Sequence, residues 1–573
     1  MQSKYDILKY KCDKGGCNLE IRLKTGPGRK VEKIHLDKPV TGETLVKQYA
    51  GDVEYRILAM KVGNVLQELT SVLECDCDVE LLDMRNHGAN LTYQRSVSLI
   101  YLKAVKDVLG DVHVEIDNSL NKGIYTEIRM PDAVKEQQVR EVAARMQQLI
   151  DADIPIKKII LDKKSAISFF MESGLRKKAQ LLTQTPQVEE LVCYELDGYR
   201  NSFYGPMVPS TGYIEHFELK KYHRGVILRF PYPSAPDRIP EYVDERKLCS
   251  AFGESKKWHR LLDVAYLCDL NEKIETDKFK ETVLLSEALH EKKIAEIADE
   301  ICKEHKRIVL LAGPSSSGKT TTARRLCVQL KVNGMDPLYL GTDDYFVERY
   351  QTPLDENGEP DYENLGAVDI ELFNDNMNGL LEGRVVDLPE FDFIEGKKIF
   401  GKRLTQLDPN RPIVIEGIHA LNPELTKYID DAWKYRIYIS PFVQLNMDYH
   451  SRMHTTDARM IRRMVRDYKY RGKSAEATID EWPKVRKGED KNIFPYNGTA
   501  DVLFNSALSY EFGILKKYAE PLLKNIGSDK PQYSEAQRLL HMLQYVKSYN
   551  DDSVVPNNSI LREFIGGSIF VEE

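Results

Sequence analysis

A nine-residue segment, Gly313-Pro314-Ser315-Ser316-Ser317-Gly318-Lys319-Thr320-Thr321, constrains this chain more than any other feature. It matches the phosphate-binding loop pattern GxxxxGK[ST]. An apolar, β-branched run at 307–312 predicts a buried strand before the loop, and the residues from Thr321 to Leu330 predict a helix after it. In a strand–loop–helix unit the loop amides and the helix N-terminus point at one place, which favours a bound phosphate chain. The segment therefore predicts triphosphate binding, with Lys319 on the β/γ-phosphates and the Thr320 hydroxyl on Mg²⁺.

The overall composition is that of a protein with several domains. The chain has 573 residues, of which 42% are hydrophobic and 30% charged, and its net charge is −8. The length predicts three or four domains, and the net charge gives no global electrostatic reason for binding nucleic acid or a membrane. No apolar run approaches the roughly 18 residues of a membrane span. The nine cysteines are scattered and odd in number, so we expect a cytoplasmic protein with reduced thiols.

Two cysteine pairs, Cys12-x4-Cys17 and Cys75-x-Cys77, raise the question of a metal site. Neither pair is followed by a second pair at ligand spacing, so free thiols are expected.

The segments on either side of the phosphate loop differ in pattern. Residues 31–83 alternate short apolar runs with turn residues, and Gly63-Asn64 is a turn dipeptide between two of the runs. Helical patterns cover 96–109, 131–150, most of 258–305 and 534–549, and strands are expected at 154–161, at 191–194 and within 214–230. The proline-rich stretch 231–240 is expected to be a connector. From 305 to 523 strands and helices alternate, which predicts an α/β domain with a parallel sheet.

Two carboxylates follow predicted strands of this domain. Asp343 comes soon after the run 338–341, where it would act as general base for an acceptor hydroxyl; an acidic turn is the alternative. Glu416 ends the run 412–416, where it would join Thr320 around Mg²⁺; an acid on an exposed loop is the alternative.

Arginines are concentrated in the predicted helix 457–472. Four of them are spaced three, four and seven residues apart, which puts them on one face, and a fifth lies near the helix end: Arg459, Arg462, Arg463, Arg466 and Arg471. Arginines that close over a transferring phosphoryl group position it and stabilise its charge. A solvated basic helix or an RNA-facing patch is the alternative.

Six motifs between 306 and 523 resemble the uridine kinase and phosphoribulokinase family, in the family's order and at similar spacings. They are GPSSSGKTT, TDDYF at 342–346, ENLGAVD at 363–369, PEFDF at 389–393, IEGIHAL at 415–421 and DARMIRRMVRDYKYRG at 457–472. The resemblance implies ATP- and Mg²⁺-dependent phosphorylation of a hydroxyl, most simply the 5′-hydroxyl of a nucleoside.

The resemblance also implies roles around the phosphates. Asp343 falls on the family's catalytic base, and Thr320 and Glu416 fall on its magnesium positions. Arg466 and Arg471 fall on lid arginines that contact the ATP phosphates.

Around the acceptor the resemblance is less complete. Arg463 and Lys473 fall on positions that approach the nucleoside, and Glu363 stands where uridine kinases carry an aspartate that grips the ribose hydroxyls. Phe391 replaces a tyrosine, and Gly396 replaces a histidine that contacts the base. A pocket recognises a base through hydrogen bonds, and the loss of these two donors removes that discrimination. The resemblance therefore supports phosphoryl transfer but not uridine as the acceptor.

Residues 30–230 resemble the TGS module and the editing domain of threonyl-tRNA synthetases. The resemblance rests on KVGN at 61–64, EL at 68–69, VELL at 79–82, KGIY at 122–125 and YGPMVPSTGYI at 204–214. The editing site normally uses two histidines, a cysteine and a further histidine, whose positions carry Arg95, Leu99, Phe203 and Met207 here. The resemblance therefore implies neither a metal nor aminoacyl-tRNA hydrolysis, and the surviving shape could bind RNA, a nucleoside or another subunit.

The predicted fold class is α/β: a P-loop kinase domain preceded by a β-grasp module and an α+β domain. The expected division is a TGS-like module at 1–85, an editing-like domain at 86–235, a helical connector at 236–304, the kinase domain at 305–525 and a C-terminal helical extension at 526–573. A nucleoside-like small molecule is the expected partner, with no membrane, and a homo-oligomer is expected.

Two other functions stay open. One is an RNA- or ribosome-associated protein in which ATP acts as a switch, which would not need Asp343 and Glu363 placed for a sugar. The other is a sugar-phosphate kinase, for which the basic residues after PEFDF would hold the acceptor phosphate: Lys397, Lys398, Lys402 and Arg403.

Overall fold

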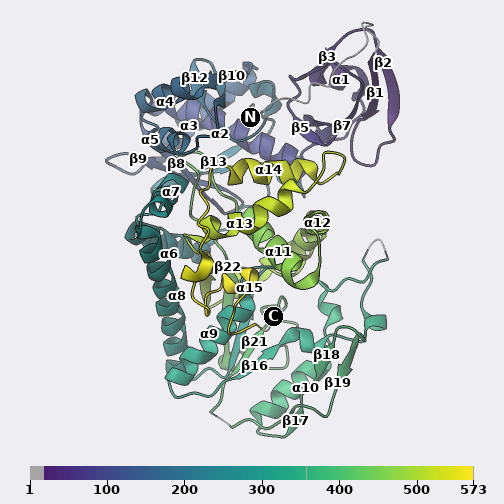
Figure 1. The fold of residues 1–573 in the computed structure, drawn as a ribbon, viewed down its shortest axis with the longest axis vertical. Helices are drawn as coiled ribbons and strands as arrows, with labels where there is room; N and C mark the ends of the chain where they lie inside the picture. The colour runs from purple at the N-terminus through teal and green to yellow at the C-terminus, as the bar shows by residue number, and fades with distance from the viewer. Residues whose placement is uncertain (1–18, 356–357, 409, 572–573) are drawn as a thin grey trace.

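The computed structural model describes residues 19–355, 358–408 and 410–571. The N-terminal half of the chain lies at the top of Figure 1 and the phosphate-loop domain lies below it, with the last helices between them. Within the described ranges, no helix is long and apolar enough to cross a membrane. The pair Cys12-x4-Cys17 lies outside the described residues.

The first unit is a small sheet with one helix. Its strands are β1 (Leu19–Lys24), β2 (Glu32–Leu36), β3 (Val40–Thr41), β4 (Ile57–Val62), β5 (Val65–Gln67), β6 (Val72–Leu73) and β7 (Cys77–Asp83), with α1 (Gly42–Tyr49) between β3 and β4. The five-stranded sheet has the order β2-β1-β7-β4-β5, and β1 runs parallel to β7. Gly63 and Asn64 form the turn between β4 and β5, as predicted, and Gly63 has a φ of +57°. Cys77 has a free thiol.

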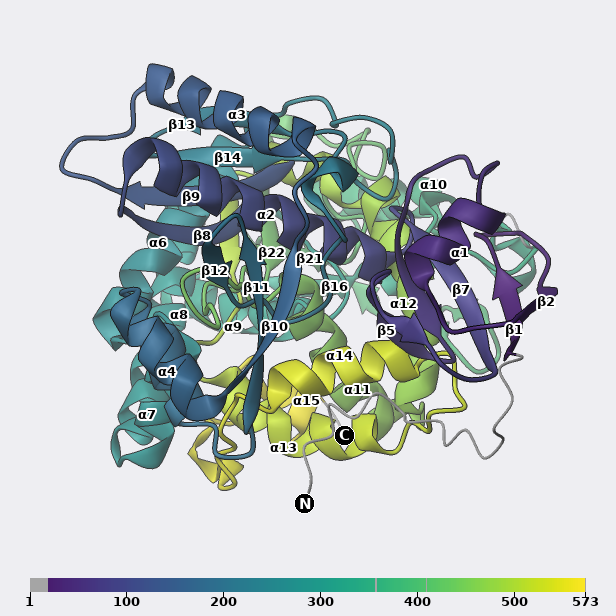
Figure 2. The same cartoon turned by 90° about the horizontal axis from the view of Figure 1, so that it is seen from above.

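The second unit is built around the long helix α2 (His87–Leu109), which starts nine residues earlier than predicted. Asn86 caps it by accepting hydrogen bonds from the amides of Gly88 and Ala89. A four-stranded sheet has the order β13 (Glu218–Tyr222), β14 (Gly225–Arg229), β9 (Gly123–Arg129) and β8 (His113–Leu120). A three-stranded sheet contains β10 (Lys157–Asp162), β11 (Glu190–Leu196) and β12 (Tyr199–Asn201), and the remaining helices are α3 (Glu136–Asp151), α4 (Lys163–Glu172) and α5 (Arg176–Thr183). Seen from above, the first unit lies at one side of this second unit (Figure 2).

Three helices connect these two units to the phosphate-loop domain: α6 (Arg246–Leu262), α7 (Leu267–Glu275) and α8 (Lys278–Lys303). The domain itself is a five-stranded sheet in which every pairing is parallel, with the order β16 (Leu338–Gly341), β21 (Ile413–Glu416), β15 (Ile308–Ala312), β22 (Lys434–Ser440) and β23 (Val502–Asn505). All five residues of β15 are buried, as expected for a central strand covered on both faces. The prediction of a parallel α/β domain is confirmed.

The helices of this domain are α9 (Lys319–Val332), α10 (Ile370–Leu381), α11 (Thr455–Arg471), α12 (Ala475–Asn492) and α13 (Glu511–Lys524). Four short strands form two hairpin-like pairs beside α10: β17 (Val386–Asp387) with β20 (Leu404–Thr405), and β18 (Glu390–Asp392) with β19 (Lys397–Ile399). The chain ends with α14 (Tyr533–Leu543), which is shorter than the predicted helix, and α15 (Arg562–Ile565). The predicted helix at 131–150 likewise begins only at Glu136.

Candidate active site

The phosphate loop connects β15 to α9, as the sequence predicts. A Cβ atom on Gly313 would collide with the carbonyl oxygen of Ile439 on β22, so only glycine fits there. Gly318 has a φ of +83°, and Ser316 has a φ of +61°, which is unusual for a residue with a side chain. The loop is therefore held in a strained conformation of the kind that accompanies ligand sites.

Polar groups of this loop lack partners within the protein. In the described part of the chain, the hydroxyls of Ser316 and Ser317 are buried and make no hydrogen bond. The Lys319 ammonium donates one long hydrogen bond, 3.3 Å, to the carbonyl oxygen of Pro314. Buried polar groups are normally hydrogen-bonded, so this loop fits a polar ligand such as a phosphate chain.

Two oxygen groups suited to a divalent cation meet beside the loop. The Thr320 hydroxyl donates to Glu416 Oε1 at 2.9 Å, and the Tyr339 hydroxyl donates to the same oxygen at 3.2 Å. Burial raises the pKa of Glu416, Asp343 adds to the rise, and Lys319 opposes it. Hydroxyl and carboxylate oxygens are ligands that Mg²⁺ accepts, so Thr320 and Glu416 fit the predicted metal role.

The two aspartates after β16 have different partners. Asp344 forms an ion pair with Arg403 at 2.8 Å. Asp343 keeps an exposed surface; the surrounding protein displaces part of its water, which raises its pKa, and the nearby Lys319 ammonium opposes that rise. Asp343, Lys319 and Glu416 therefore belong to one electrostatic cluster, while Asp344 is engaged elsewhere.

Three arginines of α11 gather around one buried carboxylate, Asp467. Arg466 approaches it at 2.7 Å, Arg463 at 3.2 Å and Arg471 at 3.5 Å, and its side chain has no exposed surface. Sequence reasoning missed Asp467, although it lies four residues from both Arg463 and Arg471, a spacing at which helical side chains meet. Asp467 keeps the two predicted lid arginines, Arg466 and Arg471, on the side of the helix that carries Arg463.

The other two arginines of α11 have structural partners. Arg459 is buried, donates to the carbonyl oxygen of Ser315 at 2.9 Å and pairs with Glu489. Arg462 is also buried but pairs with Glu511 at the start of α13. The expectation that all four spaced arginines share one face is wrong for Arg462, because the neighbouring helix supplies a carboxylate on its other side.

The predicted acceptor residue Glu363 lies against α12. A Cβ atom on Gly488 would lie 2.8 Å from the Glu363 Cβ, and Asn492 donates to the Glu363 carbonyl oxygen at 2.6 Å. Burial and the nearby Glu489 carboxylate raise the pKa of Glu363 to about 7. Glu489 also accepts a hydrogen bond from the Ser315 amide at 3.0 Å, so one side chain touches both the phosphate loop and the acceptor region. Nothing in the local sequence pattern pointed to Glu489.

An aromatic cluster lines the same region. Phe391 lies 5.7 Å from Phe346 and 5.2 Å from Phe393, measured between ring centroids, and Tyr362 lies 6.1 Å from Phe346. Phe393 is exposed, whereas Phe391 is buried. Aromatic faces of this kind suit a planar ring.

Arg349 fills the space next to Gly396, which is the position at which uridine kinases carry a histidine. A Cβ atom on Gly396 would lie 2.8 Å from the Arg349 Cβ, and the Arg349 amide donates to the Gly396 carbonyl oxygen at 2.9 Å. Sequence reasoning missed Arg349 because it comes from a different segment of the chain.

The last two predicted acceptor residues share a partner. Lys473 lies 2.6 Å and Arg463 lies 3.3 Å from Glu481 on α12, and Arg463 also donates to the Ser315 hydroxyl at 2.9 Å. Arg463 therefore bridges the phosphate loop and α12.

The basic residues after PEFDF are all paired with carboxylates. The pairs are Lys397 with Glu395, Lys398 with Asp369, Lys402 with Glu390 and Arg403 with Asp344. This pairing leaves little unneutralised positive charge for an acceptor phosphate.

The four editing-site positions hold no metal-ligand chemistry. Leu99, Phe203 and Met207 are buried in one apolar core. Arg95 donates to the carbonyl oxygen of Pro206 at 3.0 Å and to the Thr92 hydroxyl at 3.3 Å.

Sequence comparison agrees with this geometry. Residues 308–510 match the sequence model of the Phosphoribulokinase / Uridine kinase family. The N-terminal half is similar to the N-terminal region of threonine–tRNA ligases. Identity is 26% over 202 residues with the ligase of Acidithiobacillus ferrooxidans, covering 35% of this chain and 31% of the relative, and 27% over 219 residues with that of Halorhodospira halophila, covering 36% and 34%. The chain thus spans about a third of the length of these relatives.

Among solved structures, the chain resembles one described as a possible uridine kinase from Bacillus stearothermophilus. The match has 20% identity and a TM-score of 0.22, and it covers 37% of this chain and 99% of that one.

Proposed function

We propose that this chain is a kinase that transfers the γ-phosphoryl group of ATP, with Mg²⁺, to a hydroxyl of a small molecule, most simply the 5′-hydroxyl of a nucleoside. The observation that carries the proposal is the cluster of Lys319, Asp343 and Glu416 at the phosphate loop. Phosphoryl transfer to a hydroxyl requires a base for that hydroxyl and a cation site beside the phosphates. The Asp343 carboxylate near Lys319 can act as the base, and Glu416 can hold the cation.

In this proposal each residue has one task. The loop amides and Lys319 would bind the phosphates of ATP, and Thr320 and Glu416 would hold Mg²⁺, which neutralises charge on the phosphate oxygens. Asp343 accepts the proton of the acceptor hydroxyl and orients its oxygen. Arg466 and Arg471, held by Asp467, supply positive charge where negative charge develops.

The acceptor region supports a nucleoside more than a sugar phosphate. The aromatic cluster around Phe391 suits a planar base, and the Glu363 carboxylate suits a pair of sugar hydroxyls. A sugar phosphate would instead need unpaired cations, whereas the lysines after PEFDF are neutralised. The switch hypothesis, contact of the N-terminal half with RNA, and a homo-oligomeric state stay predictions.

The test is ADP formation from Mg²⁺-ATP by the purified protein, measured against nucleosides, free sugars and sugar phosphates. Asp343→Ala should lower acceptor-dependent turnover by about 10²- to 10⁴-fold, the range for loss of a general base. Nucleotide affinity, measured by titration of the same variant, should stay within about twofold, because no hydrogen bond in the described part of the chain joins the Asp343 carboxylate to a loop amide.

Asp344→Asn is the matched control, because it removes a carboxylate from the same turn whose partner is Arg403. It should lose much less activity than Asp343→Ala. Equal losses in both variants would refute the role given to Asp343. Slow ATP hydrolysis that responds to RNA and to no small acceptor would favour the switch hypothesis.

A further inference from the structure

The C-terminal segment from Ser559 to Ile565 lies on the phosphate loop. A Cβ atom on Gly318, the last glycine of the loop, would collide with Cγ2 of Ile560. Ile560 and Leu561 have no exposed surface. The segment is therefore packed against the loop as part of the fold.

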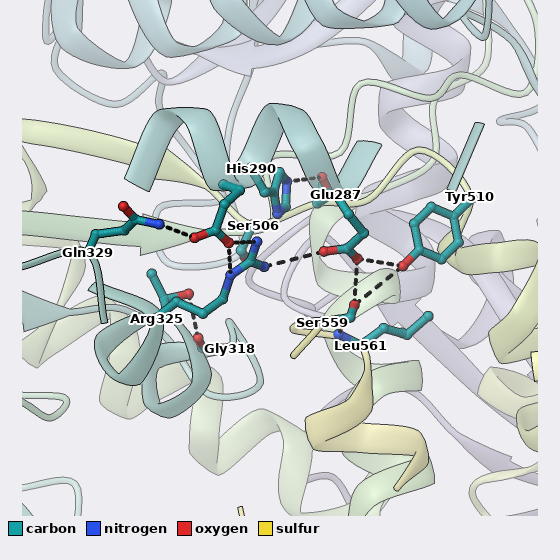
Figure 3. Close-up of polar contacts among 12 residues, drawn as sticks. Glu287, His290, Gly318, Arg325, Gln329, Ser506, Tyr510, Ser559 and Leu561 are labelled. Atoms are coloured by element: carbon teal, nitrogen blue, oxygen red, sulfur yellow. Dashed lines mark hydrogen bonds and ion pairs between the residues drawn. The ribbon is translucent and has the colours of Figure 1, made fainter. Parts of the chain in front are cut away.

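A buried polar network attaches this segment to α8 and α9 (Figure 3). The Ser559 hydroxyl donates to Glu287 at 2.6 Å and accepts from the Leu561 amide at 3.1 Å. The Tyr510 hydroxyl donates to the same Glu287 oxygen at 2.7 Å. The other Glu287 oxygen lies 3.4 Å from Arg325, which is fully buried on α9. The helix that follows the phosphate loop and the C-terminal segment thus share one carboxylate.

The same segment also contacts the arginine helix α11. Lys469 donates to the Ile565 carbonyl oxygen at 2.8 Å, and the Arg462 guanidinium lies 5.2 Å from the centroid of the Phe564 ring. The segment therefore lies between the two helices that would enclose the nucleotide.

Glu563 carries the only charge of this segment that reaches the loop helix in the described structure. Its Oε2 accepts a hydrogen bond of 2.8 Å from the Thr321 hydroxyl and one of 3.3 Å from the Thr321 amide. Thr321 is the third residue of α9, so its amide is one of the N-terminal donors that have no partner within the helix. Such a position attracts an anion, and the anion here is a carboxylate of the same chain.

We propose that Glu563 is a further residue of the nucleotide site, and that in the free protein it occupies the place of a nucleotide phosphate at Thr321. Binding of the nucleotide phosphates displaces the carboxylate, since two anions repel each other at one donor. Displacement of Glu563 removes its two hydrogen bonds to Thr321 of α9, which makes local opening of the 559–565 segment easier. The inference rests on the proposed function, because it requires the loop to bind a nucleotide.

The expected effect follows from competition. If the docked carboxylate leaves about a tenth of the molecules competent to bind, the apparent Kd is about tenfold higher than the intrinsic one. Glu563→Gln keeps the shape of the side chain but removes its charge, so nucleotide affinity should increase by about tenfold. Asp551→Asn is the matched control: Asp551 is exposed in the same C-terminal region, and it caps Ser553, which an asparagine can also do.

The experiment titrates ADP and ATP, with Mg²⁺, into wild type, Glu563→Gln, Asp551→Asn and Lys319→Ala. Amide hydrogen exchange of residues 559–566 is measured in the same samples. We expect Glu563→Gln alone to bind nucleotide more tightly than wild type. The amides of residues 559–566 should exchange faster in Glu563→Gln, or in wild type with bound nucleotide, than in free wild type.

Three outcomes separate this inference from the proposed function. If wild type binds nucleotide, Lys319→Ala does not, and Glu563→Gln binds equally or more weakly, the inference is overturned while nucleotide binding stands. If wild type binds poorly and Glu563→Gln binds well, the inference is strongly supported. If no variant binds nucleotide, the proposed function fails and the inference fails with it.

Discussion

Glu363 offers a direct test of the site's electrostatics, because burial and Glu489 raise its pKa from 4.5 to about 7. A raised carboxyl pKa means that the folded state holds a proton more tightly than the unfolded chain does. The stability that this proton provides is present below pH 4.5 and is lost as the pH rises towards 7. A shift of about 2.5 units corresponds to about 3 kcal/mol, at 1.36 kcal/mol per unit.

The perturbation is Glu363→Gln, which resembles the protonated side chain and cannot ionise. Wild type and variant should have similar free energies of unfolding near pH 4.5, and the variant should become more stable than wild type by up to about 3 kcal/mol at pH 8. Urea unfolding at a series of pH values measures this difference, and Glu371→Gln, on the exposed side of α10, controls for the loss of one negative charge. A difference that is constant from pH 5 to pH 8 would refute the reasoning.

The same titration should appear in acceptor binding. If the Glu363 carboxylate accepts hydrogen bonds from sugar hydroxyls, acceptor affinity rises as the pH passes through about 7, and Glu363→Gln abolishes that rise. Affinity that falls with pH in wild type would contradict this role.

Two other changes test the frame of the site. Asp467→Asn removes the carboxylate that holds three arginines. It should lower the free energy of unfolding, measured in urea, by about 3–5 kcal/mol. A loss of less than about 1 kcal/mol would show that the arginines do not depend on Asp467. Gly313→Ala inserts a methyl group against the Ile439 carbonyl. It should lower the free energy of unfolding by about 1–3 kcal/mol and abolish the nucleotide binding that a titration measures. Unchanged binding would contradict the packing argument.

The sequence predicted the parallel sheet, the phosphate loop and the carboxylates near it, because these features follow from local patterns. A buried strand, a glycine-rich loop and a helix are contiguous in the chain, so their geometry is encoded within one stretch. The positions of Thr320, Glu416 and Asp343 near Lys319 follow from neighbouring parallel strands whose carboxyl ends meet at one edge. These are the parts that a single sequence can specify.

The parts that were missed depend on contacts between distant segments. Glu489 reaches Ser315 across 174 positions of the chain, and Glu563 reaches Thr321 across 242. Arg462 was placed with the other arginines because helical spacing cannot reveal that Glu511 lies on its opposite side. A spacing rule describes one helix, whereas the role of each side chain depends on which element packs against it.

The contacts between the two halves explain how the N-terminal half matters to the site. The loop between β22 and α11 enters the second unit, where Asp448 is fully buried and lies 3.4 Å from the equally buried Lys178. The Tyr204 hydroxyl donates to Asp448 at 3.0 Å, and His450 lies 3.0 Å from the Asn201 amide nitrogen. A buried ion pair is costly to separate, since each charge would then be left without its partner. The start of α11, and with it the arginines that face the phosphate loop, is therefore held in place by the editing-like unit.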